Sequence, residues 1–245
     1  MKFAYLAILA AVATTTCSAA KEDKELLTEA PTPAPGTAAA ELAKPAPDVS
    51  KLPAGAYKTD PSHTSLTFQV NHLGFSTYTA GFDKVEADLT IDPKDPATAT
   101  LKASIPLVSL DLPAPPKGFV EELTGPNFLN AAKTPVMTFL STTVKVTGPA
   151  EADVTGDLTL NGVTKPVTMS VAYNGGWEGI PPDPFARIGF SAHGVLKRSE
   201  FGIAYGIPSA GNPMGVGDEV KFAIETEMVG PAWKDAPKAP ATPGQ

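Results

Sequence analysis

Apolar and polar residues alternate one by one through residues 64–73, which read TSLTFQVNHL. Leu66, Phe68, Val70 and His72 share one phase of this alternation, and polar residues stand between them. Because successive side chains of a β-strand point to opposite faces of its sheet, the pattern predicts a strand with one buried face. Such strands must pair their edges, and this requirement restricts the fold more than any other feature of the sequence.

The same pattern recurs in seven further segments. They are residues 81–91, 98–105, 135–147, 152–160, 165–173, 186–197 and 218–228. The links between successive segments are short, as in the Asn-Gly turn at 161–164, so neighbouring strands should be antiparallel. Eight such strands either stack as a sandwich or close into a barrel, and closure removes the exposed edges. The interior of an eight-stranded barrel is packed by its own side chains or holds one small ligand.

Residues 107–130 interrupt the strand pattern. Turn-forming residues there surround a segment near 117–123, KGFVEEL, that has helical character. Gly125-Pro126 follows it and provides a stop signal for a helix. We therefore expect a long loop that contains one short helix.

Proline separates both ends of the chain from its body. Six of the 26 prolines lie between Pro31 and Pro53, and four lie from Pro231 onward. These stretches contain no aromatic residue except Trp233, so they bury too little surface to offset the entropy of ordering the chain. We expect the domains to divide as a disordered linker at 21–55, one folded domain at 56–230 and a disordered tail at 231–245.

The first twenty residues, MKFAYLAILAAVATTTCSAA, contain a basic residue, an apolar stretch and small residues at the end. This order predicts a signal peptide at residues 1–20, cleaved before Lys21, and hence a periplasmic or secreted protein. The alternative is lipoprotein processing at Cys17, which would tether the chain to a membrane by an acylated cysteine. The TTT tripeptide before Cys17 is a poor lipoprotein signal. Cys17 is the only cysteine, so the folded domain has no disulfide or thiolate chemistry.

The charge and the motif content narrow the function. The net charge is −7, and the longest basic run is the pair at 197–198, which argues against nucleic acid as a partner. The sequence contains no G-x-S-x-G nucleophile motif and no phosphate-binding glycine loop. We therefore expect a binding protein without a cofactor, and not an enzyme.

Five segments, in order, resemble the YceI-like family. They read YKTDPSHTSLTFQVNHLG with GFDKVEADLTID, ELTGPNFLNAAKTPVMTFLST, VTGDLTLNGVTKPVTMSVAY, RIGFSAHGVLKRSEFGI and GDEVKFAIETE. The resemblance extends over residues 57–228 and implies an all-β fold, an extended eight-stranded antiparallel lipocalin-like β-barrel with a short helix in the loop near 117–130. It also implies export to the bacterial periplasm and a polyisoprenoid chain bound in the barrel lumen.

A polyisoprenoid tail offers no hydrogen bonds, so its site would be an apolar tunnel. Burial contributes about 0.8 kcal/mol per methylene, part of which offsets the cost of ordering the chain. The side chains expected to face the lumen are Phe68, Val70, His72, Phe82, Leu89, Ile91, Leu101, Ile105, Phe139, Leu158, Leu160, Met169, Val171, Phe190, Phe222 and Ile224. Each would serve equally well in a filled core, and alternation does not distinguish the two.

The three histidines show no metal-ligand spacing, so we predict no metal site. His72 is in phase with the inward residues, whereas His63 is out of phase and follows Asp60-Pro61, a turn signal. His193 lies far along the chain. We expect His63 and His72 to form hydrogen bonds at the barrel end, and His63 remains a candidate for contact with a ligand head group.

Arg198, in the segment KRSEFG, is the second head-group candidate because its planar guanidinium suits a pyrophosphate. An ion pair with Glu200, Asp60 or another carboxylate is the favoured alternative. Phe201 would act as a plug, and Gly202 would supply a permissive backbone position.

The main hypothesis is an exported lipid-binding protein that carries or stores an apolar chain in the cell envelope. A quinone, a prenyl phosphate and a fatty amide all suit an apolar tunnel. The alternatives are a hydrolase or isomerase acting on a lipid, and an envelope stress-protection protein without a specific ligand. The sequence leaves open whether two copies form a homodimer.

Overall fold

The computed structural model describes residues 49, 51–211 and 213–233. The predicted signal peptide, Cys17 and most of the predicted linker and tail lie outside these residues. The strands are β1 (Gly55–His72), β2 (Ser76–Phe82), β3 (Glu86–Ile91), β4 (Thr100–Pro106), β5 (Leu110–Asp111), β6 (Val136–Gly148), β7 (Glu151–Leu160), β8 (Val163–Trp177), β9 (Phe185–Lys197) and β10 (Val216–Ala232). The helical elements are η1 (Pro96–Thr98), η2 (Leu107–Ser109), α1 (Phe119–Leu123) and η3 (Arg198–Phe201).

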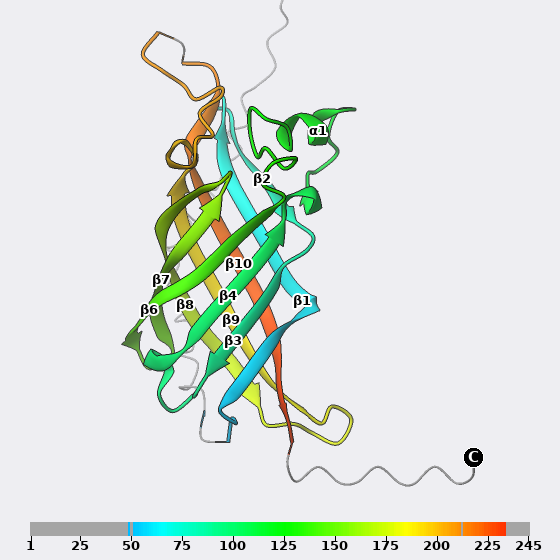
Figure 1. The fold of residues 1–245 in the computed structure, drawn as a ribbon, viewed down its shortest axis with the longest axis vertical. Coiled ribbons are helices and arrows are strands. Elements are labelled where there is room, and N and C mark those ends of the chain that lie inside the picture. Colours follow the sequence, from blue (N-terminus) through cyan, green and yellow to red (C-terminus); the bar gives the residue numbers. More distant parts are fainter. Residues whose placement is uncertain (1–48, 50, 212, 234–245) are drawn as a thin grey trace, which may run out of the picture. The chain divides into compact units, whose positions relative to one another are not determined.

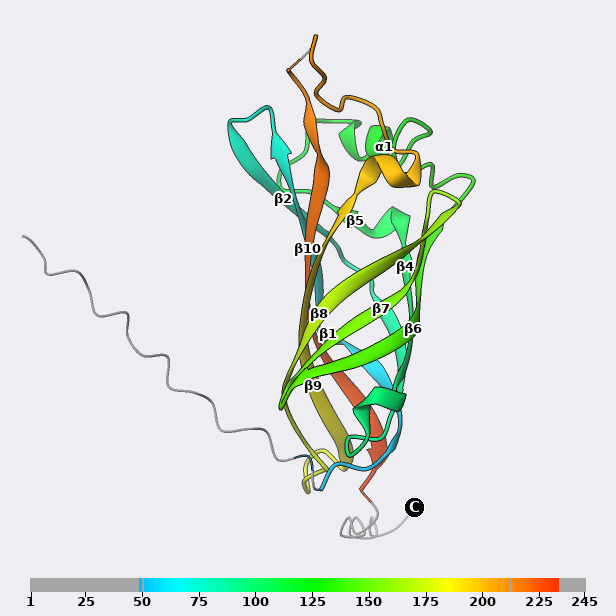
Figure 2. The same ribbon diagram turned by 90° about the vertical axis from the view of Figure 1, so that its left-hand side faces the viewer.

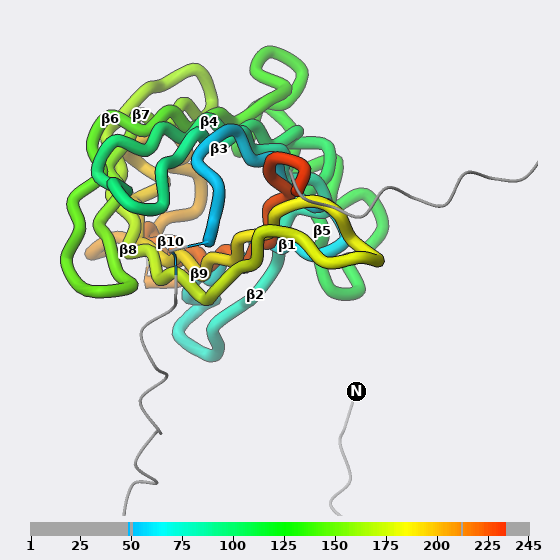
Figure 3. The backbone as a smooth tube through the Cα atoms, turned by 90° about the horizontal axis from the view of Figure 1, so that it is seen from below, coloured from blue at the N-terminus to red at the C-terminus, as the bar shows by residue number. Residues whose placement is uncertain are grey.

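The strands form one sheet in the order β10-β9-β8-β7-β6-β4-β3-β1-β2-β5. β1 also pairs with β10, so the sheet closes on itself into a ring of eight strands, with β2 and β5 outside the ring (Figures 1 and 2). All pairings are antiparallel. The ring is seen end-on in Figure 3. The predicted extended eight-stranded barrel is therefore confirmed.

β1 begins at Gly55 and continues as one strand through Asp60-Pro61, where the sequence predicted a turn. Its register against β10 shifts between Thr59 and Thr64, so residues 60–63 form a β-bulge. A bulge accommodates Pro61 because the residue needs no ladder hydrogen bond there. Asp60 still makes the local hydrogen bond that is typical of a turn, since the backbone N–H of Ser62 donates to Asp60 Oδ1 at 3.0 Å.

The predicted single strand at 81–91 is wrong, because β2 and β3 are separate strands. Both lie along the same edge of β1: β3 pairs with residues 55–58 and β2 with residues 66–72. Residues 59–65 of β1 consequently have no ladder partner on this edge, and only Thr59, Thr64 and Ser65 among them pair with β10 on the other edge. We call this interruption, together with the facing link at 83–85, the seam.

The helix predicted near 117–123 is confirmed as α1, at the upper end of the barrel in Figure 1. It packs through Phe119, Val120 and Leu123 on a small cluster that includes Leu110 and Leu112. The long loop is thereby fixed beside the upper opening. No helix among the described residues is long and apolar enough to cross a membrane.

Buried side chains close the interior at two levels. The upper cluster contains Leu107, Ala131, Phe139, Val154, Leu158, Leu160, Val167, Met169, Ala192, Phe201 and Ile203. The lower cluster contains Leu52, Tyr57, Leu89, Ile91, Ala186, Ile188 and Met228. Phe201, which was expected from the sequence to act as a plug, is fully buried in the upper cluster, and Gly202 has a φ of 75°. Val49 also packs on the lower cluster, so the described residues just before β1 contribute to the core.

Tyr57 fixes the lower cluster to the chain that precedes β1. Its hydroxyl donates to the carbonyl oxygen of Pro53 at 2.6 Å, and its side chain is fully buried. Burial raises the pKa of Tyr57 to about 12, with a smaller contribution from Tyr173. The phenol therefore remains a neutral hydrogen-bond donor throughout the physiological pH range.

Glycines provide the space for two interior aromatic rings. A Cβ added at Gly194 would lie 2.4 Å from Cζ of Phe222, and one added at Gly156 would lie 2.4 Å from Cζ of Phe139. Real Cβ atoms do not approach ring carbons so closely, so each ring must move if its glycine is replaced. The rings that fill the barrel therefore depend on glycines in neighbouring strands.

We expect Gly194→Ala to lower the free energy of unfolding by about 2 kcal/mol, because Phe222 must leave its position. Urea unfolding followed by tryptophan fluorescence measures this loss. Gly189→Ala is the matched control in the same strand, since its added Cβ would lie 3.7 Å from the nearest atom. The control should change stability by no more than about 0.5 kcal/mol. Equal losses in both variants would show that the ring contact is unimportant.

Candidate functional site

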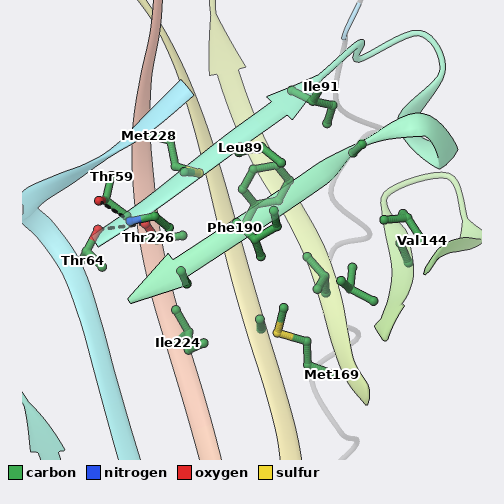
Figure 4. A pocket seen from close by; sticks show the side chains of 18 of the residues that line it. Thr59, Thr64, Leu89, Ile91, Val144, Met169, Phe190, Ile224, Thr226 and Met228 are labelled. Carbon is green, nitrogen blue, oxygen red and sulfur yellow. Dashed lines mark hydrogen bonds between the residues drawn. The ribbon is translucent and has the colours of Figure 1, made fainter. Parts of the chain in front are cut away.

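An apolar cavity of about 160 Å³ lies inside the barrel, where the upper and lower clusters meet. All eight strands of the ring contribute side chains to its wall, generally from alternate positions (Figure 4). Five of the lining residues are alanines, at 87, 99, 103, 152 and 192. Small side chains at these positions leave space that leucine or phenylalanine would fill.

Seven of the side chains predicted to face the lumen line this cavity. They are Leu89, Ile91, Leu101, Met169, Val171, Phe190 and Ile224. The other predicted side chains do not line the cavity. Phe139, Leu158 and Leu160 belong to the upper cluster, and Phe82 and Phe222 pack against that cluster. Ile105 is buried elsewhere, Phe68 packs on the cluster beside α1, and Val70 is half-buried.

The volume indicates what the empty barrel accepts. An apolar cavity of about 150 Å³ in another protein stays dry and admits benzene, so this cavity suits roughly one ring or a short stretch of chain. A longer chain requires lining side chains to move. Met169, which is unbranched, and the many alanines make that adjustment easier than a wall of branched residues would.

Threonines provide the only polar side chains of the cavity wall, and all three lie near the seam. The Oγ1 atoms of Thr64 and Thr226 are 2.8 Å apart and hydrogen-bonded (Figure 4). Thr59 Oγ1 accepts the backbone N–H of Ala87 at 3.1 Å. The bulge at 60–63 places Thr59 out of phase with the inward residues of β1. Thr64 and Thr226 are in phase with Leu66 and Ile224, but the sequence reasoning did not select them because it looked for apolar side chains. The alanines at 87, 103 and 192 are likewise in phase with residues that it did identify.

His63 belongs to a partly exposed ionic network on the outer face of the bulge. Its Nδ1 lies 3.1 Å from Asp60 Oδ2, which also accepts a hydrogen bond of 2.6 Å from Arg187 Nη1. Arg187 further contacts Asp183 through Nε and Glu227 through Nη1, at 2.5 and 3.4 Å. The hydrogen bond to Asp60, followed by that to Asp183, raises the pKa of Arg187 above its ordinary value.

The network does not require a metal ion. Ligand atoms of Asp60, His63 and Glu227 lie within 4.8 Å of one another. Arg187, however, already binds both carboxylates of that group and supplies the positive charge. The other histidines lie elsewhere, since His72 pairs with Val216 of β10 and His193 pairs with Ala223. This register places His72 and His193 roughly 20 Å apart along the barrel.

His72 does not point into the lumen as expected. It is exposed at the end of β1, where its ring centroid lies 6.3 Å from that of Tyr78. The register against β10 shifts between Val70 and His72, which is the last residue of β1. His72 still pairs with Val216 of β10 and Ser76 of β2, but its side chain is exposed to solvent.

Asp60 makes the stability of the barrel depend on pH. The hydrogen bond from Arg187 holds the pKa of Asp60 well below its usual range, and His63 and the N–H of Ser62 act in the same direction. A carboxyl group whose pKa falls on folding stabilises the fold above its unfolded pKa, near 4, and this contribution is lost as pH falls toward the folded pKa. Neutral pH therefore retains the whole contribution.

We expect Asp60→Asn to cost about 1 kcal/mol of unfolding free energy at pH 7. The difference from the unmodified chain should shrink as the pH falls below about 4, because the carboxyl group of the unfolded chain becomes protonated there while that of the folded chain is still ionised. Urea unfolding at pH 7, 5 and 3 measures both values. Asp157→Asn, at an exposed position of β7, should leave the pH profile unchanged. A constant difference at all three pH values would exclude the proposed role of ionised Asp60.

Arg198 is buried and forms no salt bridge with a carboxylate among the described residues, so the predicted ion pair is wrong. Its guanidinium instead donates to four backbone carbonyls at 2.8–3.0 Å. The acceptors are the oxygens of Ile203, Tyr205, Val216 and Gly217. Burial lowers the pKa of Arg198 below its ordinary value. Arg198 therefore fixes the loop between η3 and β10, and its donors are not available to a ligand.

Comparisons with known proteins agree with this geometry. The sequence profile of the YceI-like domain matches residues 57–228. Protein YceI of Escherichia coli O157:H7 is 40% identical over 152 residues, which are 61% of this chain and 77% of that protein. The solved YceI protein of Campylobacter jejuni is 25% identical, with a TM-score of 0.55 over 66% of this chain and 90% of that chain.

A third likeness concerns the fold alone. A polyisoprenoid binding domain from Saccharophagus degradans, implicated in plant cell wall breakdown, has a TM-score of 0.53 and 12% sequence identity. The likeness covers 73% of this chain and 100% of that domain.

Proposed function

Because the chain belongs to the YceI-like domain family, we propose that it is a lipid-binding protein that holds an apolar chain of the isoprenoid type in its barrel. The main support for this proposal is the cavity wall, to which all eight ring strands contribute and in which only threonines are polar. The chain of an isoprenoid offers methyl and methylene groups and no hydrogen-bond partners. Such a wall matches it without leaving polar groups unsatisfied.

The energy available from such a chain is sufficient for binding. One isoprene unit has five carbons, so its burial contributes about 4 kcal/mol before the cost of ordering is subtracted. Two or three buried units therefore supply micromolar affinity. A solved domain of the same fold is described as polyisoprenoid binding, which supports the same ligand class here.

The proposal includes a role in the cell envelope. The N-terminal twenty residues have the composition of a secretory signal, so we infer that the barrel is exported and carries or stores its lipid outside the cytoplasm. A barrel that encloses the chain prevents its contact with water during transfer. The apolar wall by itself suits a quinone, a prenyl phosphate or a fatty amide equally well.

The test is to purify the full chain from cells, extract it with organic solvent and identify the extract by mass spectrometry. We expect close to one lipid with a long apolar chain per protein. The extracted protein should then bind added geranylgeraniol, as measured by native mass spectrometry. Absence of a lipid from the extract, together with failure to bind geranylgeraniol, would overturn the proposal.

A further inference from the structure

The wall of the barrel is interrupted beside the cavity. At the seam, residues 59–65 of β1 lack a ladder partner on the side of β2 and β3. The hydrogen bond from the N–H of Ala87 to Thr59 Oγ1 replaces a backbone ladder bond at one edge of this gap. Val85, from the link between β2 and β3, lines the cavity from the other side of the seam. Side chains and not a hydrogen-bonded sheet therefore separate the lumen from solvent here.

A groove with both polar and apolar lining residues lies beside this interruption. It has a volume of about 380 Å³ and is formed by β1, β2 and the segment around β5. Thr64 lines both the groove and the internal cavity. The groove wall also carries the hydroxyls of Ser65 and Thr67 and the carboxylates of Asp83 and Asp111. Cavity and groove thus meet at one residue of the seam.

The chemistry of the groove favours one kind of head group. No lysine or arginine lines it, whereas two carboxylates do, so a phosphate there would be repelled. At the seam itself, Thr226 Oγ1 donates to the backbone oxygen of Glu227 at 3.3 Å, which leaves Thr64 as the donor to Thr226. Both hydroxyl protons are therefore used within the protein, so the hydroxyl oxygens can only accept hydrogen bonds from a ligand.

We propose that the lumen opens sideways at the seam and that the groove binds the polar end of the lipid, an alcohol, amide or amine that donates hydrogen bonds and carries no negative charge. This inference rests on the proposed function, since it assigns the head group of the same ligand. The apolar chain occupies the cavity, and the head group passes Thr64 to reach Asp83 and Asp111. Arg198 takes no part, because its donors are bound to carbonyls.

The first test compares three ligands with the same chain: geranylgeraniol, geranylgeranylamine and geranylgeranyl diphosphate. We expect the alcohol and the amine to bind the full chain at least tenfold more tightly than the diphosphate in native mass spectrometry. Equal or tighter binding of the diphosphate would overturn the head-group assignment and leave the proposed function intact. Failure of all three to bind would instead reject the proposed function.

Substitutions that remove one negative charge test whether the groove causes the preference for the amine over the diphosphate. Asp83→Asn and Asp111→Asn should each reduce the preference for the amine over the diphosphate by at least threefold. Asp157→Asn removes the same charge from the exposed face of β7, so it controls for net charge and should leave the preference unchanged. If the three variants behave alike, the groove is not the head-group site.

The second test blocks the seam. Ser65→Cys is introduced into a Cys17→Ser chain and modified with a bulky maleimide, and the rate of geranylgeraniol uptake is measured by stopped-flow tryptophan fluorescence. We expect uptake to slow at least tenfold. Ser170→Cys, on the exposed face of β8, is the control and should retain the original rate after the same modification. Unchanged uptake after modification at Ser65 would overturn the lateral opening.

Discussion

We expect Ala192→Phe to weaken the binding of a prenyl chain roughly 100-fold or more while the barrel remains folded. Ala192 is buried and lines the cavity from β9, between β8 and β10. A ring at this position occupies the space of about one benzene molecule, which is close to the whole cavity of about 160 Å³. Excluding one isoprene unit from the wall removes about 4 kcal/mol of burial, part of which is returned as chain entropy.

Isothermal titration calorimetry with geranylgeraniol measures this loss, and circular dichroism verifies that the sheet is retained. Ala223→Phe is the matched control, because Ala223 is exposed on the outer face of the neighbouring strand β10. It should bind the prenol as the unmodified chain does. Unchanged affinity in a folded Ala192→Phe variant would show that the prenyl chain binds somewhere other than this cavity.

Arg198→Met should lower the free energy of unfolding by about 4 kcal/mol. Methionine fills much of the space but donates no hydrogen bonds, so the four carbonyls that Arg198 now satisfies lose their partner. Arg198→Lys should recover only part of the loss, because one ammonium group does not reproduce the planar geometry of five N–H donors. Urea unfolding at neutral pH measures all three chains.

Lys197→Met is the control for Arg198→Met, since Lys197 is the preceding residue and is exposed. It removes the same charge, and its effect should stay within about 0.5 kcal/mol. If Arg198→Met were as stable as Lys197→Met, the loop between η3 and β10 would have to hold its position without the guanidinium.

The strands were predictable because their signal is local, whereas closure of the sheet into a barrel was predicted from the resemblance to the YceI-like family. Alternation at Leu66, Phe68 and Val70 records directly which face of β1 is buried, and the Asn-Gly turn records a hairpin. The bulge at 60–63 was not predictable in the same way. Asp60-Pro61 reads as a turn in sequence, and only the register against β10, far along the chain, shows that the strand continues.

The candidate site was predictable only in part, for a related reason. Alternation identifies Phe190 and Phe222 equally as inward residues, yet Phe190 lines the cavity and Phe222 packs against the upper cluster. Whether an inward ring lines the cavity or fills the core depends on its packing against glycines such as Gly194 and on the position of buried side chains such as Phe201. Both are contacts between segments that are distant in the sequence. The partners of Arg198 are backbone carbonyls, which carry no residue-type signature, so the segment KRSEFG did not reveal them.

Closure of the ring by its first and last strands has a consequence for biosynthesis. Lys58 pairs with Val229 and Phe68 with Phe222, so these contacts join almost opposite ends of the domain. Until β10 has left the ribosome, β1 and β9 each present an unpaired edge on which nascent chains can associate. A premature stop codon before residue 216 should therefore yield an aggregating product and not a smaller working barrel.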